Sequence, residues 1–232
     1  MKKLLILLLI TYSTVLFAQN KTELVKEVEI QCNKNDYLFC RLLASDYYEG
    51  DGVRQDKLKA VELFQKACNG NEIISCVTLG VMYAEGDSVR QDKFKAVKLF
   101  QIACNRNHVV ACGNLGVMYS KGEGVRQDKF KAVEFLQQAC DGKYVIACFN
   151  LGIHYDNGEG VRQDKFKAVE LYQKTCDSKY ASGCINLGMM YDYGEGVRQD
   201  KSKALNFYGK GCDLKSQKGC ENYAKLKNMG VK

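Results

Sequence analysis

Apolar positions follow two helical patterns that alternate along the chain with a period of 36 residues. In the first pattern, Cys112, Leu115 and Tyr119 are spaced three and four residues apart, which places them on one face of a helix. Gly122 follows, and glycine is typical of a left-handed cap at a helix C-terminus. We therefore predict a helix that ends at Gly122 and at its equivalents in the other units.

The second pattern begins at an aspartate that is the same in every unit. A carboxylate ahead of an apolar-periodic stretch accepts hydrogen bonds from the free N–H groups of a helix N-terminus. Apolar residues follow with helical spacing, as in Phe130, Val133 and Leu136, and the chain contains no proline to interrupt a helix. The predicted N-caps are Asp56, Asp92, Asp128, Asp164 and Asp200.

A small residue follows the leucine of each first helix. Glycine costs about 1 kcal/mol relative to alanine in a helix interior, so its recurrence indicates that a neighbouring helix approaches closely. A tyrosine stands three residues after the small residue. We interpret it as a core residue whose hydroxyl forms a hydrogen bond at the edge of the core. The small residues are Ala44, Gly80, Gly116, Gly152, Gly188 and Ala224, and the tyrosines are Tyr47, Tyr83, Tyr119, Tyr155 and Tyr191.

The two patterns together predict an all-α solenoid of stacked helix pairs, an αα-superhelix with a concave inner surface. The string V-R-Q-D-K recurs unchanged at 53, 89, 125, 161 and 197. The expected divisions are an N-terminal half-repeat at 19–39, full repeats at 40–75, 76–111, 112–147, 148–183 and 184–219, and a C-terminal cap at 220–232.

Residues 1–18 have the pattern of a secretory signal peptide. Lys2 and Lys3 precede an apolar run, and Ala18 stands before polar sequence. We expect a secreted or periplasmic protein without a membrane anchor. Without Lys2 and Lys3 the net charge falls from +7 to about +5, and basic residues alternate with acidic ones. No concentrated basic stripe indicates nucleic-acid binding, and we expect a monomer.

The chain has twelve cysteines in pairs with seven residues between the members. In an oxidising compartment this pattern indicates a disulfide framework. Zinc sites favour tighter cysteine spacing and often add histidine, whereas this chain has only His108 and His154. We therefore expect no metal and no cofactor.

Disulfides between the two cysteines that are separated by seven residues would use every cysteine of the chain. Pairing across a repeat, such as Cys76 with Cys104, remains the alternative. The short pairs are Cys32–Cys40, Cys68–Cys76, Cys104–Cys112, Cys140–Cys148, Cys176–Cys184 and Cys212–Cys220.

The succession L-G-x-x-Y, G-x-G-V-x-x-D and K-A-x-x-x-[FY] resembles the Sel1-like repeat, a longer relative of the tetratricopeptide repeat (TPR). The cysteine pairs resemble those of the secreted cysteine-rich Sel1-like proteins of the Hcp family. The resemblance covers nearly all of the chain after the signal peptide. It implies a TPR/Sel1-like solenoid, disulfides within each C-x7-C pair, export from a Gram-negative bacterium and roles in host interaction. It also implies penicillin binding and slow β-lactam hydrolysis, with a β-lactam or a peptidoglycan-like small molecule as ligand.

Catalytic motifs do not support the β-lactamase alternative. The strings S-x-x-K, S-D-N and K-T-G of serine enzymes are absent from the sequence. We expect no serine paired with a histidine, and we interpret His154 as a packing variant of the methionines found at its equivalents. Whether the chain is an enzyme, and which residues would then be catalytic, stays open.

A binding function has a clearer physical basis in an asparagine that recurs two residues after the unit cysteine. Its amide offers both a donor and an acceptor, so a row of them can pair with an extended peptide or protein backbone. Equally, each asparagine can hydrogen-bond the neighbouring unit and serve packing alone. The candidate binding residues are Asn114, Asn150, Asn186 and Asn222, and Met82, Met118, His154 and Met190 are expected to vary the pocket between repeats.

Overall fold

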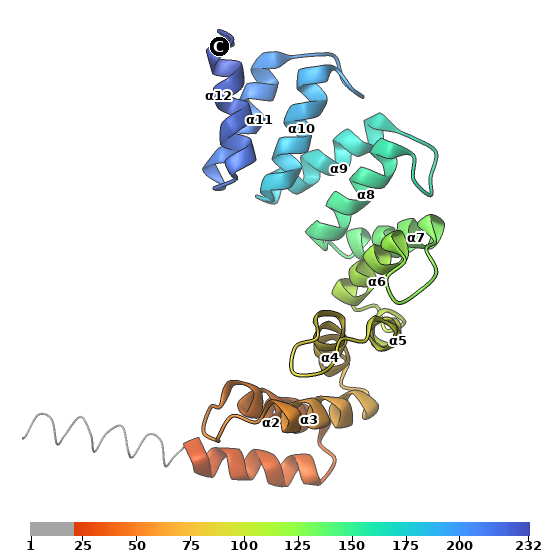
Figure 1. The fold of residues 1–232 in the computed structure, drawn as a ribbon, viewed down its shortest axis with the longest axis vertical. Coiled ribbons are helices and arrows are strands. Elements are labelled where there is room, and N and C mark those ends of the chain that lie inside the picture. The colour runs from red at the N-terminus through yellow and green to blue at the C-terminus, as the bar shows by residue number, and fades with distance from the viewer. Residues whose placement is uncertain (1–20) are drawn as a thin grey trace, which may run out of the picture. The chain divides into compact units, whose positions relative to one another are not determined.

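The computed structural model describes residues 21–232, which contain helices and loops and no strand. The predicted signal peptide, residues 1–18, lies outside the described residues. The chain divides into two compact units, Met1–Arg106 and Asn107–Lys232. We call these two larger bodies unit 1 and unit 2, as distinct from the 36-residue repeats that each contains. Each unit is described by itself (Figure 1).

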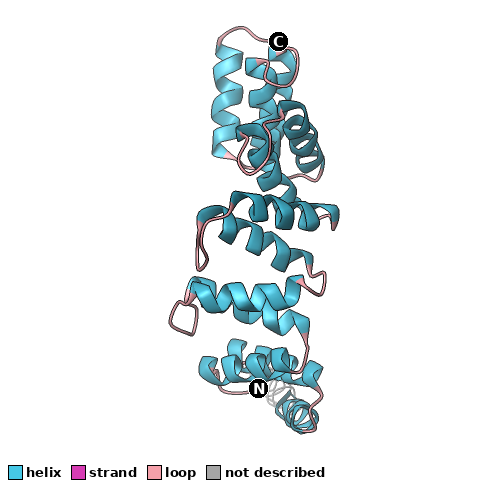
Figure 2. Cartoon of the chain, turned by 90° about the vertical axis from the view of Figure 1, so that its right-hand side faces the viewer, coloured by secondary structure: helices cyan, strands magenta, loops and turns pink. Residues whose placement is uncertain are grey.

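Each unit is a series of helices joined by short loops (Figure 2). Unit 1 has helical residues 21–33, then α2 (Tyr37–Glu49), α3 (Lys57–Asn69), α4 (Ile73–Glu85) and α5 (Lys93–Cys104). Unit 2 has α6 (Val109–Lys121), α7 (Lys129–Asp141), α8 (Val145–Asn157), α9 (Lys165–Asp177), α10 (Ala181–Tyr193), α11 (Lys201–Asp213) and α12 (Gln217–Asn228). Each first helix from α2 to α10 packs on the second helix of its own repeat, as α6 does on α7, and α12 packs on α11. The predicted all-α solenoid of helix pairs is confirmed.

The helix caps are those that the sequence predicts. Asp128 accepts from the backbone N–H of Lys131 at 3.0 Å, and each equivalent aspartate caps its own second helix in the same way. Gly122 has φ +73° and donates its N–H to the Met118 carbonyl. A residue with a side chain rarely adopts this left-handed conformation, so glycine ends every first helix from α2 to α10.

Within each unit, disulfides join the end of one helix to the helix that follows it. The pairs Cys32–Cys40, Cys68–Cys76, Cys140–Cys148, Cys176–Cys184 and Cys212–Cys220 are present. Cys104 and Cys112 are also disulfide-bonded, and residues 21–232 contain no free cysteine. Within unit 2, the short pairing therefore fastens α7 to α8, α9 to α10 and α11 to α12.

The glycine after each leucine is required by a close helix contact, as predicted. A Cβ on Gly116 would lie 2.6 Å from Leu136 Cγ of α7, and one on Gly188 would lie 2.7 Å from the Tyr208 ring of α11. Both distances are far shorter than van der Waals contact. In the pairs that carry glycine, a bulky second-helix residue thus packs against bare first-helix backbone, while α2 has Ala44 at this position.

The repeated tyrosines are half-buried, and they close the loop between the two helices of a repeat. The Tyr119 carbonyl accepts the N–H of Asp128 at 2.9 Å, and its ring stacks on Phe135 with centroids 5.5 Å apart. In unit 1, Lys59 Nζ lies over the Tyr47 ring and donates to its hydroxyl at 2.6 Å. The expected edge partner is therefore a lysine at this position.

Phe130 does not belong to the core, contrary to the helical spacing that includes it. Its side chain is 78% exposed, while Ala132, Leu136, Ala139 and Cys140 form the buried face of α7. Two residues correspond to about 200° of helix rotation, so Phe130 lies opposite Ala132. The exposed face also carries its equivalent Phe166, which is 73% exposed.

None of the helices described over residues 21–232 has the length and apolar character needed to cross a bilayer.

Candidate functional site

The predicted asparagines all lie in unit 2, on its first helices α6, α8, α10 and α12. Burial of Cys112 and Leu115 fixes the rotation of α6, and this leaves Asn114 half-buried at the border of the core. Asn150, Asn186 and Asn222 are half-buried in the same way. Since α6 contacts α8, and α10 contacts α12, the structure brings the asparagines onto neighbouring first helices.

Partly exposed apolar side chains flank these asparagines, at positions four residues before and three or seven residues after them. Ile146 is 42% exposed and Tyr193 is 62% exposed, whereas Val117 and Ile153 are half-buried. A surface that mixes amides with apolar groups can satisfy a peptide backbone and also bury its side chains. We call this surface the first-helix face, and it comprises Val110, Asn114, Val117, Ile146, Asn150, Ile153, Asn186, Met189, Tyr193 and Asn222.

Asn186 differs from the other asparagines because its amide interacts with the Tyr172 hydroxyl of α9 and acts to lower the pKa of that group. That hydroxyl also donates to Asp156 Oδ2 at 3.3 Å. Asp156 in turn pairs with Lys165, which reaches Glu195 at 2.8 Å. Burial raises the pKa of Tyr172 well above its ordinary value, and the neighbouring Asp156 carboxylate adds to the effect. This interaction with Tyr172 is of the kind that the packing interpretation expects, and both interpretations of the asparagine row stay predictions.

Asn222 lines a small pocket between α10, α11 and α12. The pocket has a volume of about 180 Å³. Tyr208 lies at one wall, and burial raises the pKa of its phenol, with a further contribution from Asp192. Lys218 and Lys225 bring positive charge to this end of unit 2. The lining residues are Met189, Asp192, Tyr193, Tyr208, Lys218, Asn222, Lys225 and Leu226.

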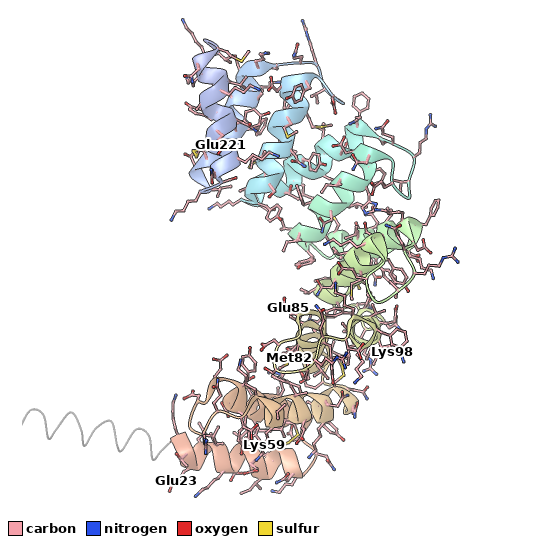
Figure 3. The ribbon with its side chains drawn as sticks, in the orientation of Figure 1. Glu23, Lys59, Met82, Glu85, Lys98 and Glu221 are labelled. Carbon is pink, nitrogen blue, oxygen red and sulfur yellow. A yellow bond between two sulfur atoms is a disulfide. The ribbon has the colours of Figure 1, made fainter. Side chains whose placement is uncertain are left out.

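The prediction that the methionine and histidine positions vary a binding pocket is wrong. Met118 is 5% exposed, Met190 is 3% exposed and His154 is 4% exposed. Met82, labelled in Figure 3, is 4% exposed in unit 1. These side chains belong to the core between helices. The interpretation of His154 as a packing variant of methionine is consistent with this burial.

The expectation that no serine pairs with a histidine is also wrong. Ser120 Oγ lies 3.1 Å from His154 Nε2, and His154 Nδ1 lies 2.7 Å from the Glu159 carbonyl oxygen. Lys129 Nζ lies 3.3 Å from Ser120 Oγ and 2.7 Å from Glu159 Oε2. This lysine lowers the pKa of the Glu159 carboxyl group. Because Ser120 and His154 are 34 residues apart, no local motif signals the pair.

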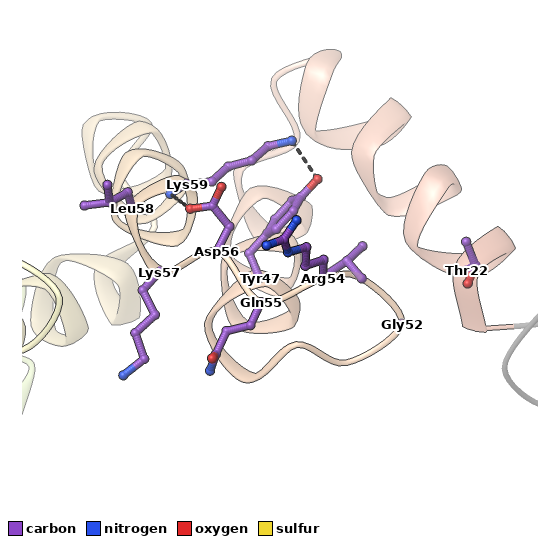
Figure 4. A pocket seen from close by; sticks show the side chains of 10 residues that line it. Thr22, Tyr47, Gly52, Arg54, Gln55, Asp56, Lys57, Leu58 and Lys59 are labelled. Carbon is purple, nitrogen blue, oxygen red and sulfur yellow. Dashed lines mark hydrogen bonds between the residues drawn. The ribbon is translucent and has the colours of Figure 1, made fainter.

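Sequence reasoning also missed two clefts in unit 1, which equivalent residues of successive repeats form. The first has a volume of about 870 Å³ and is lined by Tyr47, Arg54 and Lys59 (Figure 4). The second has a volume of about 880 Å³ and is lined by Tyr83, Arg90 and Lys95, and Leu58 borders both. The unchanged string V-R-Q-D-K supplies part of each lining, including Arg54 and Arg90, and its recurrence is the signal that could have located the clefts.

The lysine at the start of α3, α7 or α9 reaches an acidic residue 30 positions later, in the loop of the following repeat. Lys57 pairs with Asp87 in unit 1, and Lys129 pairs with Glu159 in unit 2. The ion pair thus connects consecutive repeats at the end of the helices opposite to the disulfides. Over residues 21–232, no three side chains of His, Cys, Asp or Glu are grouped so that they could hold a metal ion.

Comparison with known proteins relates this architecture to solved structures. A protective antigen of uropathogenic Escherichia coli strains, described as displaying an SLR fold, is 26% identical with a TM-score of 0.86. The match covers 89% of this chain and 44% of that protein, so the chain spans less than half the length of this relative. No match was found among the curated proteins.

Two further structures are similar. A Sel1 repeat protein from Oxalobacter formigenes is 21% identical, with 85% of this chain and 86% of that chain covered and a TM-score of 0.74. Cysteine-rich protein B of Helicobacter pylori is 30% identical, with 59% and 98% covered and a TM-score of 0.45. The Sel1 repeat model matches residues 39–72, 74–108, 109–144, 145–180 and 181–216. Because these five matches cover more than half of the chain, the protein belongs to the Sel1 repeat family.

Proposed function

We propose that this protein is an exported scaffold that binds an extended peptide or protein segment on the first-helix face of unit 2. The observation that carries the proposal is the row of half-buried asparagines with exposed apolar neighbours on successive first helices. Asn114 and Asn150 make no side-chain hydrogen bond to any residue within 21–232. Their amides are therefore available to a ligand backbone, whereas Asn186 interacts with Tyr172.

The rigidity of the helix arrangement favours binding of an extended peptide. The disulfides and the tight glycine contacts hold the first helices in a fixed arrangement before binding, so little conformational entropy is lost in the protein. The peptide itself loses conformational entropy on binding. Apolar contacts at Ile146 and Tyr193 can offset part of this loss. A peptide with apolar side chains at intervals matches this surface better than a highly charged one.

The setting is extracytoplasmic. Multiple disulfides indicate an oxidising compartment outside the cytoplasm. The predicted signal peptide agrees with this location, as does the description of the Escherichia coli relative as a protective antigen. A host-facing or periplasmic protein partner is therefore the most reasonable ligand class.

Selection from a random peptide library on the purified, oxidised protein tests the proposal. We expect enriched peptides to bind the double variant N114A/N150A at least about tenfold more weakly, since two backbone-pairing amides are lost. The matched control is N228A, an exposed asparagine at the end of α12. Equal binding by the wild type and the double variant would remove the first-helix face as the site.

Slow β-lactam hydrolysis, which the family resemblance implies, stays a prediction. Turnover of penicillin and cephalosporin substrates no faster than buffer, by a preparation free of host β-lactamase, would contradict it.

A further inference from the structure

Ser120 and His154 form a pair that occurs once in the described part of the chain. The positions equivalent to Ser120 hold Ala84 and Asp156, and those equivalent to His154 hold Met118 and Met190. The solenoid therefore folds with other residues at both places. A feature that the repeat does not need for folding, and that appears in a single repeat, is a candidate for chemistry.

The hydrogen bonds of His154 define which ring nitrogen carries a proton. The Glu159 carbonyl oxygen, 2.7 Å from Nδ1, can only accept a hydrogen bond, so Nδ1 must be the protonated nitrogen. In the neutral ring Nε2 is then an acceptor, and it lies 3.1 Å from Ser120 Oγ. The serine hydroxyl consequently donates its proton toward Nε2, which is the arrangement of a nucleophile beside its general base.

Lys129 brings positive charge close to the same oxygen. Its ammonium group lies 3.3 Å from Ser120 Oγ, where it favours loss of the hydroxyl proton to His154 and so helps to activate the nucleophile. Glu159 pairs with Lys129 and holds it in place. His154 is 4% exposed, which fixes its ring, while Ser120 is half-buried at the end of α6 and keeps part of its surface open to solvent.

We propose that Ser120 is a nucleophile, activated by His154, that accepts the acyl group of small esters. In the first step Ser120 Oγ bonds to the carbonyl carbon of the ester, and its proton moves to His154 Nε2. The bond from that carbon to the leaving alkoxide then breaks, and the alkoxide departs as an alcohol with the proton from Nε2. Water attacks the acyl-enzyme in the same manner, which releases the carboxylic acid and restores Ser120.

The test uses the full oxidised protein with two probes, a fluorophosphonate and p-nitrophenyl acetate. We expect one fluorophosphonate adduct per chain, located on Ser120 by peptide mass mapping, and p-nitrophenol release faster than buffer. S120A should lose both signals. H154M should reduce the rate of adduct formation about 100-fold or more, since general bases contribute about 10² to 10⁴ in rate.

H154M is a conservative test because methionine occupies the equivalent place in neighbouring repeats, so the variant should fold. The matched control is S178A, which removes a solvent-exposed serine that bonds a backbone carbonyl and has no histidine partner. Failure to label Ser120, or labelling that H154M leaves unchanged, would overturn the proposal. Both readouts are independent of peptide binding, because these variants leave Asn114 and Asn150 in place.

Discussion

The hydroxyl of Tyr172 in α9 donates a hydrogen bond to Asp156 Oδ2 of α8 at 3.3 Å, and the Asn186 amide of α10 interacts with the same hydroxyl. Tyr172 is 1% exposed, so its hydroxyl depends on protein partners. Asp156 provides the hydrogen bond, and Asn186 adds a second polar neighbour. The environment of Asn186 therefore differs from that of Asn114 and Asn150.

Replacing Asn186 should therefore destabilise the protein, whereas replacing Asn150 should not. We expect N186A to lower the free energy of unfolding by about 1 kcal/mol, because the buried Tyr172 hydroxyl loses a polar neighbour. N150A, at a half-buried site without a hydrogen-bond partner in the described chain, should change it by less than about 0.5 kcal/mol. Urea denaturation followed by circular dichroism measures both. Equal losses in the two variants would show that the Tyr172 contact contributes nothing specific.

Buried tyrosines should make the fold sensitive to alkaline pH. Burial raises the pKa of both Tyr172 and Tyr208 above the ordinary value near 10. The folded state then binds more protons than the unfolded state above pH 10, so stability is complete below that pH and falls as pH rises past it. We expect the urea midpoint to drop above pH 10 in the wild type and to drop less steeply in the variant Y172F/Y208F. A phenolate absorbance titration should show these two groups ionising only as the protein unfolds.

Most of the fold follows from local sequence signals. Asp128, Gly122 and the cysteine pairs act over fewer than ten residues, and the glycine beside Leu115 has a steric cause that a helix pattern can express. Each of these signals depends only on the 3.6-residue helix period or on backbone capping, so a single repeat is sufficient to predict it.

The candidate sites could not be predicted in this way, because the stacking of successive repeats decides which of their side chains are buried and which come into contact. Met118 lies four residues after Asn114, and such a pair shares a helix face, yet a rotation of about 40° takes Met118 into the core. The position of the next helix decides whether Asn114 or Met118 is buried. The Ser120–His154 contact joins the end of α6 to α8, so its formation also depends on stacking.

Replacement of Gly116 and of Gly209 by alanine should change the free energy of unfolding in opposite directions. A Cβ on Gly116 would lie 2.6 Å from Leu136 Cγ, so G116A forces the helices apart. We expect a net loss of about 1–3 kcal/mol, the usual cost of overpacking, despite the better helix propensity of alanine. Gly209 lies inside α11, and its Cβ would meet nothing closer than 3.4 Å. G209A should therefore stabilise the protein by up to about 1 kcal/mol. Thermal unfolding of the two variants compares them directly, and destabilisation by both would indicate that close approach is not the reason for Gly116.

The disulfides give the last prediction. Each closes a loop of nine residues, counting both cysteines. Cross-linking such a loop lowers the entropy of the unfolded chain by an amount equivalent to about 2.5 kcal/mol. We expect C140A/C148A to lose roughly this free energy of unfolding. Because solenoid repeats are stabilised by their neighbours, the loss should be largest in hydrogen-exchange protection of α7 and α8, with α11 and α12 less affected.

Reduction of the wild type supplies the control, since it opens all the bridges without changing a side chain. The reduced protein should be much less stable than C140A/C148A, and mass mapping of the oxidised protein should find only the short-range pairs. If the double variant and the wild type unfolded at the same urea concentration, the bridge between α7 and α8 would be redundant with the packing of Ala139 and Ala147, both fully buried beside it. The helix contacts alone would then set the stiffness of the repeats, and the rigidity on which peptide binding depends would survive in a reducing compartment.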